Sequence, residues 1–147
     1  MAISRTVTPG GEVNFYKEAC IAHFAGVSRK GLAAVAARIE GQAKINIVAN
    51  DQVDTGFMLN TVYHVSEDGS SYGQANSSGQ YTNKDGQQVK RRIAPEAQLI
   101  PIYDAMVVAG ANYAIFQEMM QSFLYKALVD VAAEAGGIIE AIAKGES

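Results

Sequence analysis

The segment from Arg29 to Ala49 limits the fold of this chain more than any other. Leu32, Ala36, Ile39 and Ala43 recur in it at spacings of four, three and four residues. These spacings bring the four side chains to one face of an α-helix, while most of the charged and polar residues fall elsewhere around it. The segment therefore predicts an amphipathic helix of about five to six turns. Such a helix must bury its apolar face against another element.

The residues before this helix predict an extended N-terminal arm over residues 1–13, which contains the turn signal Pro9-Gly10-Gly11. Asn14 is predicted to cap a short helix that ends near Phe24. Gly26-Val27-Ser28 is predicted to separate that short helix from the long one. The remainder of the chain, residues 14–147, is predicted to form a single domain.

Two strands are predicted from alternation and β-branched content. In residues 60–67, Thr61, Tyr63 and Val65 fall on one face of the chain and the intervening residues on the other. Residues 102–110 form the second apolar, β-branched run. These two strands are predicted to pair in a small antiparallel sheet.

Residues 67–100 are predicted to form a polar loop or hairpin insertion, because the stretch 67–92 holds almost no large aliphatic residues. A structureless loop of this length is uncommon in a compact domain. Tyr72 and Tyr81 are predicted to anchor a projecting β-hairpin that turns near Asn83-Lys84-Asp85-Gly86.

The C-terminal part predicts a short helix from Tyr113 to about Met120, capped by Asn112, and a long last helix capped by Ser122. The last helix covers residues 123–143 and carries a heptad-like apolar seam, made of Leu124, Leu128, Val131, Ala135, Ile138 and Ile142. Gly136-Gly137 lies inside it and predicts a close helix crossing or a hinge.

The predicted fold class is α+β: a small antiparallel sheet that includes the long projecting hairpin, packed against two long helices, 29–49 and 123–143. A length of 147 residues, with 48% hydrophobic and 18% charged residues, suits one globular domain.

The net charge of −3 argues against a dedicated nucleic-acid binder. A single cysteine excludes an internal disulfide framework and a cysteine-based zinc site. No membrane span and no secretory signal are expected.

Asp54-Thr55-Gly56 is the sharpest catalytic candidate, because this triplet is the signature of aspartic proteases, in which two carboxylates share a proton. A single copy would require a homodimer. The triplet follows a helix and polar residues here, whereas the protease signature follows an apolar strand. The simpler interpretation is structural: Asp54 or Thr55 caps a short helical turn, and Gly56 permits a tight bend.

Other candidate groups are incomplete. Cys20 and His23 share a helix face, but no second pair completes a metal site or an activated thiol, and His64 is the only other histidine. Lys90-Arg91-Arg92 is a basic cluster that could contact a phosphate backbone, an acidic surface of a neighbouring subunit, or solvent alone. No catalytic residue, cofactor or metal is therefore assigned.

The order of motifs resembles the tail-completion or head–tail joining proteins of tailed bacteriophages, the morphogenesis family of long-tailed phages and prophages. The resemblance covers about residues 29–66 and 102–144. It rests on Ala43-Lys44, Val53-Asp54-Thr55-Gly56 with Leu59, Tyr113-Ala114-Ile115-Phe116-Gln117-Glu118, and Phe123-Leu124-Tyr125-Lys126-Ala127-Leu128. Gln52 and Ser122 stand where that family usually has proline.

The resemblance implies a structural protein of the virion neck or tail, and not an enzyme. Such proteins assemble as rings of six or twelve copies between head and tail, contact other neck and tail proteins, and let genomic DNA pass without sequence-specific binding. They are made in the host cytoplasm, and they bind neither a membrane nor a cofactor. In this family the triplet Asp54-Thr55-Gly56 would form a structural bend.

Within this interpretation, Tyr113, Phe116, Phe123 and Leu124 are expected to lock the last helix onto the sheet. Residues 1–13 and 67–100 are expected to contact neighbouring subunits. Two alternatives stay open at this point. One is the homodimeric aspartic protease that uses Asp54, and the other is an adaptor or toxin–antitoxin-like module whose heptad helix binds a partner helix.

Overall fold

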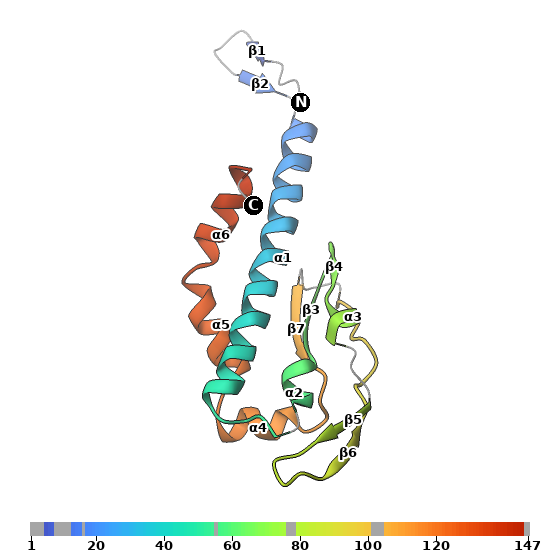
Figure 1. Ribbon diagram of the computed structural model, residues 1–147. Helices are drawn as coiled ribbons and strands as arrows, with labels where there is room; N and C mark the ends of the chain where they lie inside the picture. The colour runs from blue at the N-terminus through green and yellow to red at the C-terminus, as the bar shows by residue number, and fades with distance from the viewer. Residues whose placement is uncertain are drawn as a thin grey trace.

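One long helix organises the computed structural model, α1 (Lys17–Ala49) (Figure 1). The structure describes residues 5–7, 13–15, 17–54, 56–75, 79–100 and 105–145, with side chains from residue 26 onward. At 1.5 Å per residue the 33 residues of α1 span about 50 Å. The predicted break at Gly26-Val27-Ser28 is wrong, because these residues are helical. One glycine costs a helix only about 1 kcal/mol, and no proline is present to stop it.

The described part of the N-terminal region forms a hairpin of two strands, β1 (Arg5–Val7) and β2 (Val13–Phe15). The strands are antiparallel, with Val7 opposite Val13. Figure 1 shows this hairpin beyond the N-terminal end of α1, clear of the rest of the chain. Asn14 lies in β2 and so does not cap a helix, which corrects the sequence prediction.

The central sheet has three antiparallel strands in the order β4–β3–β7. These are β4 (Gly69–Ser70), β3 (Val62–Ser66) and β7 (Ala105–Ala109), and their positions confirm both predicted strands. The predicted hairpin also forms, from β5 (Gly79–Thr82) and β6 (Gln88–Arg91), and includes Tyr81. Tyr72 lies in a short helix ahead of it, so its predicted place in the hairpin is wrong. The hairpin was expected to be part of the central sheet. It is instead a separate two-stranded sheet.

Five further helices complete the described chain: α2 (Phe57–Asn60), α3 (Tyr72–Ala75), α4 (Ala114–Met120), α5 (Leu124–Ala132) and α6 (Ala135–Ala143). The predicted last helix is thus broken at residues 133–134, ahead of Gly136 and Gly137. Among the described residues, no atom outside the helix's own backbone lies within 4 Å of where a Cβ on either glycine would be. The close helix contact is instead at Gly31 of α1, where an added Cβ would lie 2.9 Å from Ile139 Cγ1.

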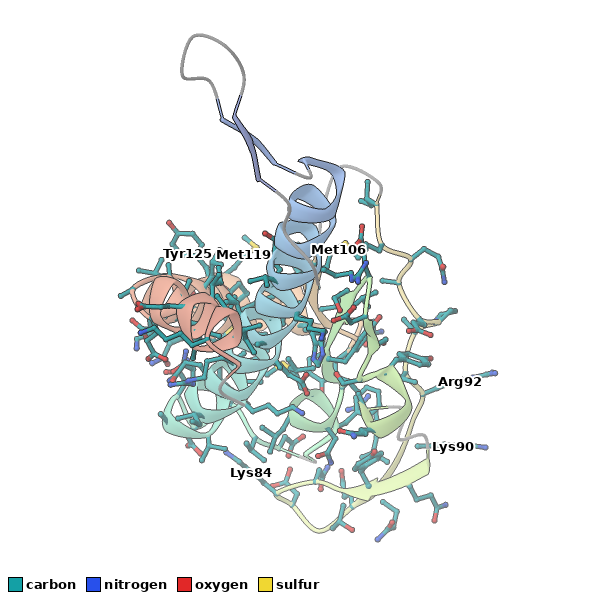
Figure 2. The ribbon with its side chains drawn as sticks, turned by 90° about the horizontal axis from the view of Figure 1, so that it is seen from above. Lys84, Lys90, Arg92, Met106, Met119 and Tyr125 are labelled. Atoms are coloured by element: carbon teal, nitrogen blue, oxygen red, sulfur yellow. The ribbon has the colours of Figure 1, made fainter. Side chains whose placement is uncertain are left out.

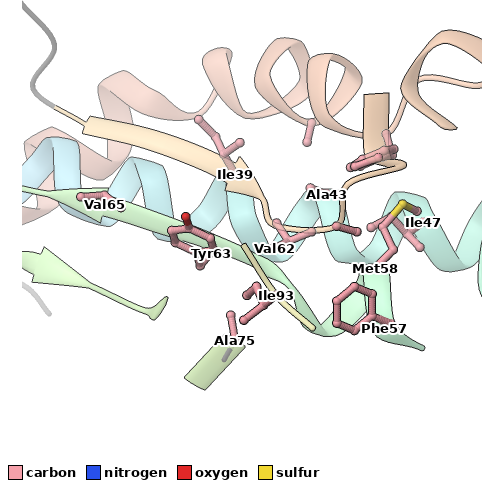
Figure 3. Packing of buried hydrophobic residues seen from close by; sticks show 14 of the residues in the cluster. Ile39, Ala43, Ile47, Phe57, Met58, Val62, Tyr63, Val65, Ala75 and Ile93 are labelled. Atoms are coloured by element: carbon pink, nitrogen blue, oxygen red, sulfur yellow. The ribbon is translucent and has the colours of Figure 1, made fainter. Parts of the chain in front are cut away.

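The core lies where α1, β3, α2 and α5 meet (Figure 3). Its most buried members come from these four elements and from the N-cap residue of α5: Ala43, Ile47, Phe57, Val62, Tyr63, Phe123, Ala127 and Val131. Val131 is therefore buried inside its own chain and cannot contact a partner helix. The adaptor hypothesis thus loses the central residue of the apolar seam that it requires.

Residues 67–100 are more than a projecting loop, because parts of this segment cover the face of β3 opposite α1. The Tyr72 ring packs edge-on against Tyr63 at 5.1 Å between centroids. Ala75 and Ile93 are buried in the core, and the backbone N–H of Ala97 donates to Tyr63 Oη at 2.9 Å. Of the described parts of this segment, the β5–β6 hairpin is the one that projects (Figure 1). The overall α+β class is confirmed, with about 51% helix and 18% strand.

Candidate interaction surface

The corner between α4 and α5 is built around the carboxylate of Glu118. Its Oε2 accepts hydrogen bonds from the backbone N–H groups of Phe123 at 2.9 Å and Leu124 at 2.8 Å. Its Oε1 accepts from the N–H of Tyr125 at 2.9 Å and from Ser122 Oγ at 2.7 Å. The first turn of a helix leaves such N–H groups without intrahelical partners. Glu118 therefore caps α5 from the preceding helix.

Burial alone would raise the pKa of Glu118, but the hydrogen bonds from Leu124, Phe123, Tyr125 and Ser122 outweigh it and hold the pKa below its ordinary value. The sequence predicts Ser122 as the cap, but within the described chain its Oγ accepts a single bond, from the Lys126 N–H at 3.2 Å. Asn112 does not cap α4 either, since the residue at its N-cap is Tyr113 and no side chain caps it. An acidic residue shortly before a helix N-terminus was the signal that could have identified Glu118.

Amide side chains at the end of α1 hold the same corner. Asn46 Nδ2 donates to the carbonyl of Phe123 at 3.0 Å, and Asn50 Nδ2 to that of Ser122 at 3.1 Å. Gln52 Nε2 donates to the carbonyls of Gln117 and Gln121 at 3.0 and 2.9 Å. Because each bond joins the α1 end to the α4–α5 corner, α4 has a fixed orientation on the body.

Three of the four residues expected to lock the last helix contact the core. Phe123 is 1% exposed, Leu124 packs against the core cluster, and Tyr113 lies with its ring centroid 6.5 Å from that of Phe57. The expectation for Phe116 is wrong, because 64% of it is exposed. Ala114 is the buried residue of α4, and a residue two positions further lies about 200° around the helix.

Phe116 belongs instead to an exposed group that we call the α4–α5 apolar surface. Its members are between 48% and 79% exposed: Ile115, Phe116, Met119, Met120, Tyr125, Leu128 and Val129. Figure 2 shows Met119 and Tyr125 together on one side of the molecule. Scattered apolar side chains are normal on a protein surface, but large groups of them mark contact sites for other proteins.

An open apolar groove of about 630 Å³ adjoins this surface, and we call it the β7 groove. Its residues come from α1, from one strand and from the α4–α5 corner: Leu32, Val35, Ala36, Ile39, Ala105, Met106, Val107, Glu118, Leu124, Tyr125 and Leu128. The apolar stripe of α1 is therefore only partly covered by the described chain.

The triplet Asp54-Thr55-Gly56 lies where the chain passes from α1 to α2. Gly56 has a φ of 81°, in the left-handed region that favours glycine. Asp54 is exposed and its Oδ1 accepts from the backbone N–H of Lys84 at 2.8 Å, so it ties down the hairpin turn and does not cap α2. Thr55, the other candidate cap, lies outside the described residues.

The basic cluster divides between two environments, as alternate residues of a strand do. Arg91 is partly buried, with its guanidinium 5.6 Å from the centroid of the Tyr113 ring, a cation–π geometry. Its Nε is buried and makes no hydrogen bond within the described chain. Lys90 and Arg92 are exposed, and both point outward in Figure 2. These two are the residues of the cluster available to a partner.

A polar cluster that sequence analysis missed joins α1 to β3. Glu40 Oε2 lies 2.6 Å from His64 Nδ1 and accepts from Ser71 Oγ at 2.8 Å, while Lys44 Nζ donates to Glu40 Oε1 at 2.7 Å. Burial raises the pKa of Glu40, but the hydrogen bonds from Lys44, His64 and Ser71 more than offset it and lower that pKa.

The Glu40 cluster ties α1 to β3 and to the turn at Ser71. Ser71 Oγ donates to the Glu40 carboxylate and accepts from the backbone N–H of His64 at 3.0 Å. Residues 24 positions apart on different elements give no spacing signal, so the sequence could not reveal the cluster.

The described residues contain no group of three or more His, Cys, Asp or Glu residues that could hold a metal ion. Cys20 and His23 fall within α1, but their side chains lie outside what the structure describes. None of the described helices has the length and apolarity required to cross a bilayer.

Comparison of the chain with protein-family models, with curated proteins and with solved structures gives no match. The resemblance to phage head–tail joining proteins therefore remains a prediction from the sequence motifs.

Proposed function

We propose that this chain is a structural protein of a tailed-phage virion that forms a homo-oligomeric ring at the head–tail junction. There it joins the head to the tail, contacts other neck and tail proteins, and lets DNA pass through its lumen. Its action in this proposal is assembly and not catalysis.

The observation that carries the proposal is the α4–α5 apolar surface. Its side chains stand on a corner that is held by the Glu118 carboxylate and by Asn46, Asn50 and Gln52 of α1. A rigid, exposed apolar surface suits a protein that is in permanent contact with other subunits of an assembly.

The two C-terminal motifs of the resemblance also support it, since they form one unit. The first ends in Glu118, and the second begins at Phe123 and Leu124, whose N–H groups Glu118 binds. The spacing between the motifs therefore has a physical reason, because the carboxylate must reach the first turn of the next helix.

The exposed cations Lys90 and Arg92 are candidate contacts for a neighbouring subunit or for passing DNA. With a net charge of −3, the chain as a whole has no excess of cations to neutralise DNA phosphates and would bind a duplex only weakly. This balance suits a conduit through which DNA must move.

The test is the mass of the purified protein across a concentration series by light scattering, with negative-stain imaging of the same fractions. Closed rings, or tubes of stacked rings, support the proposal. A particle that stays a monomer or a strict dimer at every concentration contradicts it. A strict dimer would direct attention to peptide cleavage at acid pH, the activity of the alternative aspartic protease.

A further inference from the structure

The outer edge of β7 is open. In the order β4–β3–β7, β3 lies between two strands, whereas β7 pairs only with β3 among the described residues. No backbone hydrogen bond of the described chain reaches β7 from its other side. An open strand edge is a template for another extended segment.

The direction of the free backbone groups follows from the antiparallel ladder, in which alternate residue pairs turn their N–H and C=O groups away from each other. His64 uses its N–H and its C=O on the β4 side, in bonds to Ser71 Oγ and from Ser71 N, both 3.0 Å long. Its partner across the ladder is Val107. Val107 must therefore direct its own N–H and C=O to the outer edge, and by the same alternation Ala105 and Ala109 do so too.

This edge borders the β7 groove, which has the composition of a site for an extended segment. Val107 and Met106 form one wall, Leu32 and Val35 of α1 contribute another, and Leu128 lies on the α5 side. Unpaired backbone groups beside apolar walls are costly, and a strand that pairs with them removes the cost. Main-chain pairing of this kind is a recurrent mode of recognition.

The β1–β2 hairpin is a segment of this chain that a further strand would stabilise. A two-stranded hairpin alone is at best marginally stable in water and gains from a further strand. The sequence Ile3-Ser4-Arg5-Thr6-Val7-Thr8 is rich in β-branched residues and contains no proline. Figure 1 shows the hairpin beyond the end of α1, with no sheet of its own chain beside it.

The hairpin and the groove of one chain are far apart. Leu32, the first groove residue of α1, lies 15 residues after Lys17, a rise of about 22 Å along a continuous helix. The hairpin continues beyond Lys17, away from the groove (Figure 1). A second copy of the chain can supply the hairpin without bending α1.

We propose that the β1–β2 hairpin of one copy adds to the β7 edge of a neighbouring copy, with β1 alongside β7 in the β7 groove. This inference rests on the proposed self-assembly and names the contact that produces it. Donor and acceptor lie at different places on the chain, so the contact is head-to-tail. Repeated contacts of this type close into a ring when the rotation allows it.

The test uses two full-length variants that each lose one side of the contact. Val107→Pro removes the outward N–H of β7 and leaves the pairing with β3, because proline is tolerated where the N–H faces away from the ladder. The double variant T6P/V7P removes a donor from each edge of β1. Val107→Ala is the matched control, since it shortens the side chain and keeps the N–H.

Each proline variant alone is expected to be a monomer by light scattering, while wild type and Val107→Ala assemble. An equimolar mixture of the two proline variants is expected to give a heterodimer of twice the 15.6 kDa chain mass. In it, the intact hairpin of one variant occupies the intact edge of the other. Thermal unfolding by circular dichroism verifies that each variant is folded; should Val107→Pro not fold, the mass of T6P/V7P alone decides.

Four outcomes would overturn the inference. Rings formed by T6P/V7P alone mean that the hairpin is not the donor. Rings formed by folded Val107→Pro mean that β7 is not the acceptor. A mixture that stays monomeric means that the two defects are not complementary. The first two outcomes leave the proposed function standing, whereas wild type that never assembles contradicts both.

Discussion

The carboxylate Oδ1 of Asp54 and the backbone N of Lys84 lie 2.8 Å apart, although 30 residues separate them in the chain. The bond joins the passage between α1 and α2 to the turn of the β5–β6 hairpin. The most enzyme-like motif of the sequence thus fixes the position of a projecting hairpin.

Asp54→Ala is expected to release the hairpin turn, because the Lys84 N–H loses its acceptor. Amide hydrogen exchange at Lys84 should become faster, while exchange in α1 and β3 stays unchanged and the free energy of unfolding falls by no more than about 1 kcal/mol. Asp54→Asn keeps an acceptor oxygen and should exchange almost as slowly as wild type. Peptide cleavage that is present in wild type and absent in Asp54→Asn would instead support the aspartic protease hypothesis.

Asp51→Ala is the matched control for this experiment. Its Oδ1 lies 3.3 Å from Lys84 Nζ, but both side chains are largely exposed, so the pair contributes little. An equal acceleration of exchange in Asp51→Ala would show that side-chain charge, and not the backbone bond, holds the turn.

Glu118→Ala is expected to destabilise the fold by about 2 to 3 kcal/mol, because three backbone N–H groups at the start of α5 and its N-cap lose a charged acceptor. Glu118→Gln keeps one acceptor oxygen and should cost roughly half as much. Urea unfolding measures both. Glu140→Gln is the control, since its partner Lys144 is exposed and the change should stay within about 0.5 kcal/mol.

Stability is expected to fall in acid because of two carboxylates, Glu40 and Glu118, whose pKa values are lowered in the folded state. The unfolded chain then binds more protons than the folded one, so the free energy of unfolding rises with pH. The contribution is complete above the unfolded-state pKa of about 4.3 and is lost as the pH falls through the lower folded-state values.

Urea unfolding at a series of pH values between about 6 and 2 measures this slope. The double variant E40Q/E118Q should be less stable at pH 6 and should show a flatter dependence below pH 4.3. A double variant with the same acid slope as wild type would assign acid lability to other carboxylates.

The elements that the sequence predicted correctly are those with strong local signals. The stripe of Leu32, Ala36, Ile39 and Ala43 predicts α1 because helical periodicity needs no partner, and the alternation around Tyr63 does the same for β3. The hairpin turn at residues 83–86 follows from its own turn residues.

The features that the sequence could not predict depend on contacts between distant residues. Glu40 meets His64, and Glu118 caps a helix on which it does not lie, only after the elements have packed. The burial of Ala75 and Ile93 needs the far face of β3 to be in place. The polar composition of residues 67–100 gave no sign of this burial, because a few apolar residues are enough to cover one short strand.

Phe116 and Phe123 give a paired test of the α4–α5 apolar surface, because the two phenylalanines lie seven positions apart in opposite environments. Phe116 is 64% exposed and Phe123 is 1% exposed. Phe116→Ser should leave the urea midpoint nearly unchanged and reduce assembly by light scattering, since it removes a contact that only a partner uses. Phe123→Ala should lower the free energy of unfolding by about 3 to 5 kcal/mol through loss of burial and a new cavity.

Phe116→Ser must be measured against a second exposed apolar position outside this surface, and Val48 of α1, 59% exposed, serves as that control. Val48→Ser should change neither stability nor assembly. If Phe116→Ser lowers the urea midpoint as strongly as Phe123→Ala, then Phe116 belongs to the core, and the rigid corner presents a smaller surface than we infer. If Phe116→Ser and Val48→Ser assemble like wild type, α4 does not contact the neighbouring subunit and the β7 edge must carry the contact alone.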